Sequence, residues 1–153
     1  MPGTFSQLYI QIVFAVKRRQ NFLLPSFETE VYKYMAGIIK AKDQKPLAIN
    51  GMPDHIHILI GLRPAMRISD IVRDIKNNSS NFINDHSWLK QKFAWQEGYG
   101  AFSYSQSNFG NVIDYIKNQK RHHSKYNFKK EYLSLLKKFE IPFEEKYLFE
   151  FYD

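Results

Sequence analysis

The protein has 153 residues, of which 44% are hydrophobic, so we expect one folded domain (1–153) with a sizeable core rather than a disordered chain. It has no cysteine, which excludes disulfides and thiolate metal sites, and its apolar runs are too short or wrongly flanked for a membrane span or a cleaved signal peptide. The net charge of +7 is weak support for a polyanionic partner.

The hydrophobic pattern predicts alternating strands and helices, with Ser69 and Asn108 as expected helix N-caps. Strands are expected at 7–16, 46–50 and 55–62 and in a hairpin of 92–96 with 101–105, and helices at 26–41, 70–84, 108–126 and 131–139. This order predicts an α+β fold, a ferredoxin-like or palm-like sandwich with a central antiparallel sheet. Helices would pack on one face only, which leaves the other face for a site. Residues 1–130 would form the catalytic core, and 131–153 a C-terminal helix and acidic tail.

Two histidines stand one residue apart in the segment DHIHILIGL, residues 54–62. Because side chains alternate along a strand, His55 and His57 are expected on one face with Leu59, and the isoleucines between them on the other. The two imidazoles are about 7 Å apart at the backbone and can share a metal ion, with Asp54 orienting one of them. A half-exposed histidine pair without a metal is the alternative.

The helix expected at 108–126 carries a second group of polar side chains. Tyr115 and Gln119 are spaced i, i+4 and share a face, and His122 and His123 follow one turn later. Gln119 can complete a three-ligand metal set with the two strand histidines, and His123 is the less favoured alternative. A phenol beside such a metal can attack phosphorus and carry the phosphate covalently, although most helical tyrosines are packing residues.

This combination resembles the single-tyrosine HUH transposases, named for their His-hydrophobic-His motif, and in particular the short IS200-like transposases of bacterial insertion sequences. The resemblance is carried by H-I-H in an apolar strand and by Y-x-x-x-Q on a helix 60 residues later. Further stretches that match are FAVKRRQNFL, GMPDHIHILI, WQEGYGAFSYS, YIKNQKRHH and EEKYLFE. The resemblance covers most of the chain and includes these stretches, and it implies that a helix near the C-terminus is the catalytic helix.

The resemblance implies a DNA transposase that cuts and rejoins single-stranded DNA. Tyr115 would be the nucleophile that forms a 5′-phosphotyrosine, and His55, His57 and Gln119 would hold a divalent metal, Mg²⁺ or Mn²⁺. Ligand softness alone leaves zinc, nickel and manganese open. The resemblance also implies DNA with hairpin ends as the partner, a homodimer with shared active sites, a bacterial cytoplasmic location and no nucleotide cofactor.

Basic residues are concentrated between Lys117 and Lys130, where six Lys or Arg occur with two histidines and no acid. A local stretch of this kind favours contact with a phosphate backbone, and a solvated helix face is the alternative. The candidate DNA contacts are Lys17, Arg18, Arg19, Lys120 and Arg121.

Two other functions remain open from the sequence. A non-catalytic domain that binds single-stranded nucleic acid would present aromatic side chains to bases, but it would leave the His, Tyr and Gln pattern unexplained. A domesticated nickase that cuts chromosomal hairpins would use the same chemistry as a transposase, and sequence does not separate these two.

Overall fold

The computed structural model describes residues 3–122 and 127–144 and contains one four-stranded antiparallel sheet in this part of the chain. The strands are β1 (Tyr9–Ala15), β2 (Lys45–Met52), β3 (His55–Gly61) and β4 (Gly100–Tyr104). Their order across the sheet is β2-β3-β1-β4, so β3 and β1 are the inner strands. The predicted α+β fold class with a central antiparallel sheet is confirmed.

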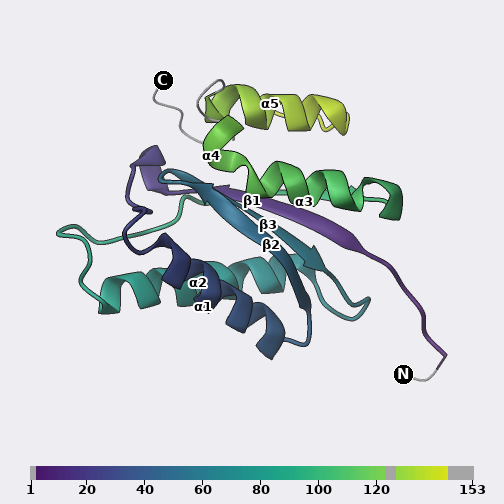
Figure 1. Cartoon of the computed structure of the whole chain (residues 1–153), viewed down its shortest axis with the longest axis horizontal. Coiled ribbons are helices and arrows are strands. Elements are labelled where there is room, and N and C mark those ends of the chain that lie inside the picture. Colours follow the sequence, from purple (N-terminus) through teal and green to yellow (C-terminus); the bar gives the residue numbers. More distant parts are fainter. Residues whose placement is uncertain (1–2, 123–126, 145–153) are drawn as a thin grey trace.

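Helices cover both faces of this sheet, as Figure 1 shows. One face carries α1 (Glu28–Ala41) and α2 (Ile68–Asp85), and the other lies beneath α3 (Phe109–Lys117), the short α4 (Gln119–His122) and α5 (Phe128–Lys138). The expectation that helices pack on one face only was therefore wrong. The apolar side of α3 is the physical reason, because its Val112 and Ile116 pack on Leu59 of β3.

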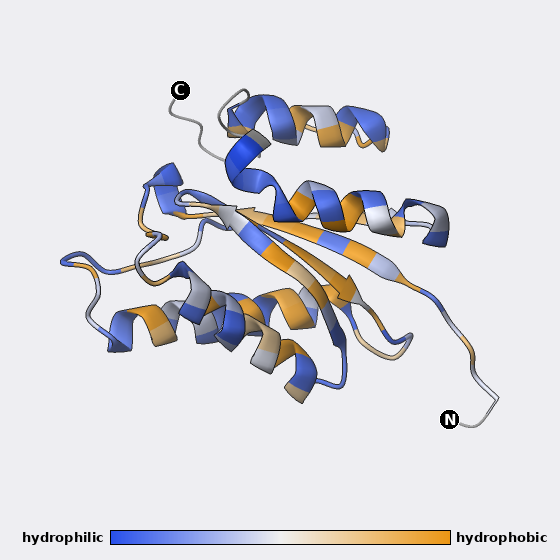
Figure 2. Ribbon diagram, viewed as in Figure 1, coloured by the Kyte–Doolittle hydropathy of each residue, from blue (hydrophilic) through white to orange (hydrophobic). Residues whose placement is uncertain are grey.

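The main core lies between the sheet and the α1–α2 layer, and β3 shows how the sequence pattern produces it. Ile56, Ile58 and Ile60 are fully buried on this face, as the strand alternation predicted. They belong to one cluster with apolar residues of the two helices, namely Val31, Met35, Ile39, Ile71, Val72 and Ile75. In Figure 2 the strands are largely hydrophobic and the outward sides of the helices are hydrophilic, which is the pattern of a sheet buried between helical layers.

The hairpin expected at 92–105 is only half present. β4 forms, but the segment before it touches the sheet through a single bridge between Val16 and Trp95. Its aromatic residues are used in the core instead: Phe93 and Trp95 pack edge to face at 4.8 Å between ring centroids, and Trp95 donates a hydrogen bond to Ser79. Burial of these rings therefore overrides the strand propensity of the segment.

The predicted helix at 108–126 is interrupted. α3 ends at Lys117, Asn118 leaves the helical conformation with φ −98° and ψ 20°, and α4 begins at Gln119. Neither predicted N-cap makes a side-chain cap bond: Asn108 precedes α3 without one, and α2 begins before Ser69. The capping side chain is Asn127, which accepts a hydrogen bond from the Lys130 backbone at the start of α5. None of the helices in the described ranges is long and apolar enough to cross a membrane.

Replacing Asn84 with alanine is expected to destabilise the protein by about 1–3 kcal/mol. Asn84 holds the loop before β4, because its side chain accepts from the Phe93 backbone N–H at 2.7 Å and donates to the Phe93 carbonyl at 3.0 Å. Urea unfolding measures the effect. The matched control is Asn78→Ala, at an exposed position of the same helix, which should change stability by less than about 0.5 kcal/mol. Equal effects of the two substitutions would contradict the assignment.

Candidate active site

The inner strand β3 places two imidazoles under the α3–α5 layer. His55 and His57 are fully buried, with their ring centroids 5.3 Å apart. The ring of Phe128 on α5 stacks on His55 at 3.9 Å, and the Tyr115 ring on α3 meets His57 edge to face at 5.8 Å. Both histidines therefore lie on the face that the strand alternation predicted, but they are enclosed rather than half-exposed.

The turn between β2 and β3 fixes the position of His55. At Gly51 a Cβ atom would stand 2.3 Å from the His55 carbonyl oxygen and 2.9 Å from the Ile56 Cα. Only glycine permits this close approach of the two backbones. The turn thereby brings Asp54 beside the His55 ring.

Each imidazole has its Nδ1 atom paired with a side-chain oxygen. His55 donates to Asp54 Oδ1 at 2.7 Å, and His57 donates to Gln11 Oε1 at 2.7 Å. With the proton of a neutral ring on Nδ1, each Nε2 atom presents a lone pair to the space under α5. A hydrogen bond behind the ring that sets the tautomer in this way is the usual arrangement of metal-binding histidines.

Asp54 is itself held by Arg19, whose Nε donates to Asp54 Oδ2 at 2.9 Å. Burial acts to raise the pKa of Asp54, but the hydrogen bonds and charges of His55 and Arg19 outweigh burial and hold the pKa below its usual range. Asp54 is therefore ionised at neutral pH. Arg19 reaches this position from a backbone with φ 53°, in the left-handed region that costs energy for a residue other than glycine.

Glu131 of α5 brings a carboxylate to the two lone pairs. Its Oε1 atom lies 3.0 Å from His57 Nε2 and 3.3 Å from His55 Nε2, and the amide oxygen of Gln119 also lies 3.3 Å from His55 Nε2. Adjacent ligands of one ion are spaced in this way, since bonds of about 2.1 Å at right angles put ligand atoms about 3 Å apart. The set His55, His57 and Glu131 could hold a metal ion, with Gln119 beside it.

A positive charge at the centre of this cluster would be stabilised by the groups around it. A lone pair of a neutral imidazole and a carboxylate oxygen repel at 3 Å unless a proton or a cation lies between them. The pKa of His55 shifts in the direction that this predicts. Burial acts to lower the pKa, but the hydrogen bonds and charges of Asp54 and Glu131 outweigh burial and raise it. Two nitrogen and two oxygen donors in this environment fit a divalent metal ion.

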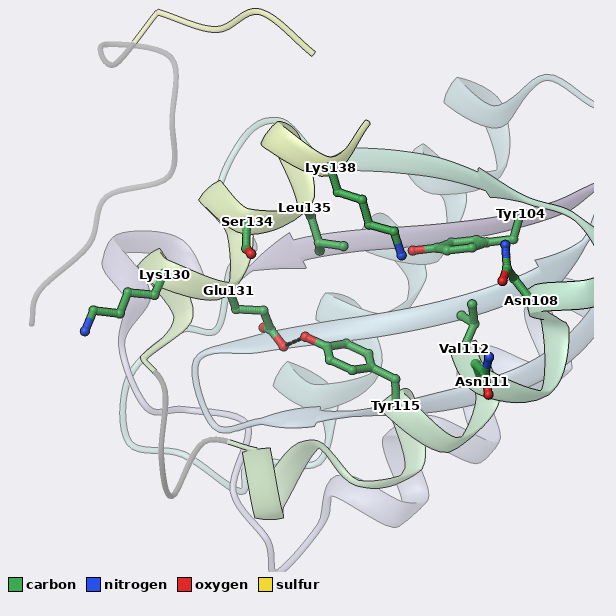
Figure 3. Close-up of a pocket in the computed structure, with 10 residues that line it drawn as sticks. All are labelled: Tyr104, Asn108, Asn111, Val112, Tyr115, Lys130, Glu131, Ser134, Leu135 and Lys138. Carbon is green, nitrogen blue, oxygen red and sulfur yellow. Dashed lines mark hydrogen bonds between the residues drawn. The ribbon is translucent and has the colours of Figure 1, made fainter. Parts of the chain in front are cut away.

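Tyr115 joins the same cluster from α3. Figure 3 shows its hydroxyl and the Glu131 carboxylate pointing toward each other from facing helices. The hydroxyl donates to Glu131 Oε2, and the Gln119 amide donates to the same oxygen at 3.0 Å. Burial and the negative charge of Glu131 raise the pKa of Tyr115 well above its usual range, so the phenol is protonated at neutral pH.

A cavity of about 600 Å³ opens beside the Tyr115–Glu131 pair, between α3 and α5. Its lining includes Tyr104 of β4 and Lys138 of α5, and in Figure 3 the Lys138 ammonium points toward the Tyr104 ring. The Tyr104 hydroxyl accepts a hydrogen bond from Gln11 at 2.7 Å, which links the cavity wall to the partner of His57. Burial raises the pKa of Tyr104 to about 12.

The structure thus brings together the four residues that the sequence singled out for chemistry, His55, His57, Tyr115 and Gln119. Glu131 was missed. An acid in the first turn of a helix ordinarily complements the helix dipole, so no sequence signal distinguished it from a surface residue. His123 lies outside the described residues.

The five predicted DNA contacts fall into two groups. Lys17, Arg18 and Arg121 are exposed. Arg19 is paired with Asp54, and the Lys120 ammonium is bonded to the Gly51 carbonyl at 2.6 Å and to Glu28 at 3.0 Å. DNA contact at all five positions stays a prediction.

Comparisons with known proteins agree with one another. The model of a family described as "Transposase IS200 like" matches residues 4–119. The ISDra2 transposase TnpA of Deinococcus radiodurans is 24% identical over 122 residues, which are 76% of this chain and 87% of that protein.

Solved structures share the fold. A candidate transposase from Deinococcus radiodurans superposes with a TM-score of 0.64 at 24% identity, covering 78% of this chain and 95% of the other. A REP-associated tyrosine transposase bound to a REP hairpin superposes with a TM-score of 0.60 at 16% identity, covering 80% and 73% of the two chains.

Asp54→Asn is expected to weaken Mn²⁺ binding by about 10- to 100-fold, because it removes the charge behind the His55 ring and leaves a weaker acceptor. Isothermal titration calorimetry measures the affinity, and circular dichroism checks that the fold is kept. Asp85→Asn, at an exposed position at the end of α2, is the control and should bind Mn²⁺ normally. An unchanged affinity in Asp54→Asn would show that the carboxylate does not support a metal site.

Proposed function

The chain belongs to the IS200-like transposase family, and on that premise we propose that it cuts and rejoins single-stranded DNA at insertion-sequence ends through a 5′-phosphotyrosine. The observation that carries the proposal is the meeting of the Tyr115 hydroxyl with the buried cluster of His55, His57, Gln119 and Glu131. A tyrosine that serves only for packing would not be expected to place its hydroxyl against two buried histidines, a glutamine and a glutamate. A non-catalytic binding domain would likewise have no use for such a cluster.

Tyr115 is the nucleophile of the proposed reaction. Its oxygen loses the phenol proton and forms a bond to the scissile phosphorus, the bond from phosphorus to the 3′ oxygen breaks, and the 3′ oxygen takes up one proton and leaves as a hydroxyl, so no net proton is released. The phosphodiester bond energy is retained in the phosphotyrosine, so the same or another 3′-hydroxyl can reverse the step and join strands without a nucleotide cofactor. His55, His57 and Gln119 would hold a divalent ion, Mg²⁺ or Mn²⁺, and such an ion would supply Lewis-acid polarisation of the phosphate.

The remaining side chains prepare the site for this attack. Asp54 and Gln11 fix the two imidazole rings so that both Nε2 atoms face the same point. The α3–α5 layer shields that point from water, and the cavity beside Tyr115 provides room for a nucleotide next to the scissile phosphate.

The proposed DNA substrate has hairpin ends. The structural relative bound to a REP hairpin supports this part of the proposal. A homodimer is a further part of it. The hydroxyl of Tyr115 reaches the histidine–glutamate cluster of its own chain. The two subunits of a dimer would therefore not need to exchange α3 for the nucleophile to reach a metal site.

Tyr115→Phe is expected to abolish covalent attachment to DNA. A labelled single strand from the element's own end is incubated with the protein and Mn²⁺, and a denaturing gel is read for a protein–DNA band. The band should be absent in Tyr115→Phe, absent with a chelator and reduced by at least about 100-fold in His57→Ala.

Tyr34→Phe is the matched control, because Tyr34 lies on α1 under the opposite face of the sheet and stacks on Phe82. It should give the full band. A band that survives Tyr115→Phe would assign the nucleophile elsewhere, with Tyr126 as the next residue to change. Tight binding to DNA without any band in the unaltered protein would favour the non-catalytic domain.

Replacing Lys17 and Arg18 together with alanine is expected to weaken binding to single-stranded DNA and to flatten its salt dependence. Each lost phosphate contact removes about 0.7 from the slope of log affinity against log salt concentration, so the pair should remove about 1.4. Fluorescence anisotropy at several salt concentrations measures the slope. The pair Lys33→Ala and Lys40→Ala on α1, at exposed positions, removes the same charge and should leave the slope unchanged. If both pairs of substitutions change the slope equally, the effect comes from the lower net charge of the protein and not from DNA contacts of Lys17 and Arg18.

A further inference from the structure

Glu131 is the residue on which metal donors and nucleophile converge. One carboxylate oxygen faces both histidine Nε2 atoms, and the other accepts hydrogen bonds from the Tyr115 hydroxyl and the Gln119 amide. The residue is 8% exposed. A carboxylate removed from water to this extent requires strong compensating interactions, and here both of its oxygens are engaged with groups of the proposed reaction.

The orientation of Gln119 adds to this picture. Because its amide nitrogen donates to Glu131 Oε2, its amide oxygen is turned toward His55 Nε2. Glu131 therefore sets which end of the Gln119 amide faces the metal position. One donor atom each of His55, His57 and Glu131 lie within 4.8 Å of one another, and the Gln119 amide oxygen lies 3.3 Å from His55 Nε2.

We propose that Glu131 is a fourth protein ligand of the divalent ion and at the same time the residue that holds the Tyr115 hydroxyl against the metal centre. The action of the ion and of Tyr115 on DNA rests on the proposed function. Binding of the ion by Glu131 does not require DNA and can be tested without it. In this arrangement α5 does more than cover the sheet, because it connects the metal position to the attacking oxygen through the two oxygens of one side chain.

The alternative role for Glu131 is inhibition. A carboxylate in this position could occupy the place of the scissile phosphate and leave when DNA binds. The two roles predict opposite effects of removing the charge, since a ligand is lost in one case and an obstacle in the other. We argue for the ligand role because Glu131 lies with His55 and His57 in one buried set whose ligand atoms are within 4.8 Å of one another, a grouping that could hold a metal ion.

Glu131→Gln tests the proposal with Mn²⁺ as the probe, and titration calorimetry of the full chain without DNA gives the affinity. The expected result is at least tenfold weaker binding in Glu131→Gln. Glu140→Gln makes the same substitution at an exposed position just after α5 and should bind normally. Unchanged or tighter Mn²⁺ binding in Glu131→Gln would overturn the ligand role.

The positioning role is tested at saturating Mn²⁺, where weaker affinity no longer limits the reaction. Single-turnover formation of the covalent DNA adduct should be at least tenfold slower in Glu131→Gln than in Glu140→Gln. An equal rate would overturn the positioning role, and a faster rate would identify Glu131 as an inhibitory group. If the unaltered protein forms no adduct but Glu131→Gln still weakens Mn²⁺ binding, the proposed function fails and the ligand role stands.

A crystal of the unaltered protein soaked in MnCl₂ makes the same test without a substitution, which covers the case in which Glu131→Gln does not fold. The anomalous signal locates the ion. A Glu131 oxygen within about 2.3 Å of it is expected for a ligand, and a Glu131 side chain turned away from a bound ion would overturn the proposal.

Discussion

Burying two imidazoles side by side on an inner strand is the constraint from which the rest of the site follows. A buried ring nitrogen needs a polar partner, and the four ring nitrogens of His55 and His57 come together here. Two of them are satisfied from behind, by Asp54 and Gln11, and these partners are themselves held by Arg19 and Tyr104. The other two face one point under α5. The partner network therefore decides both the tautomer of each ring and the direction in which its Nε2 atom points.

The sequence predicts the parts of this arrangement that depend on local periodicity. The alternation along β3 correctly separates His55 and His57 from the buried isoleucines, and the spacing of Tyr115 and Gln119 brings both to one cluster, although the helix breaks between them at Asn118. What depends on tertiary packing is not predicted. The strand expected at 92–96 was lost because Phe93 and Trp95 are needed in the core, and the bare sheet face was covered because α3 and α5 both carry apolar sides.

Glu131 illustrates the limit most clearly. Its role depends on how α5 is docked over the sheet, and the local sequence around it shows only an acid at the start of an amphipathic helix. The docking is set by apolar contacts of its neighbours: Phe128 stacks on His55, and Tyr132 packs beside Phe102 of β4. Hydrophobic packing of α5 thus positions a polar group at the site. The helical periodicity of the sequence predicts neither the surface on which α5 packs nor the direction in which the Glu131 carboxylate points.

The groups of the site are far apart in the chain, and this affects when the site can exist. Gln11 and His57 are separated by 46 residues, and His57 and Glu131 by 74. Contacts over such distances form late in folding, because long loops must close before the contacts can contribute. During synthesis the sheet pairing of β1 with β3 can form well before α5 leaves the ribosome. The complete cluster can assemble only after residue 131 has emerged and α5 has docked, so an unfinished chain carries paired histidines without the carboxylate that joins them to Tyr115.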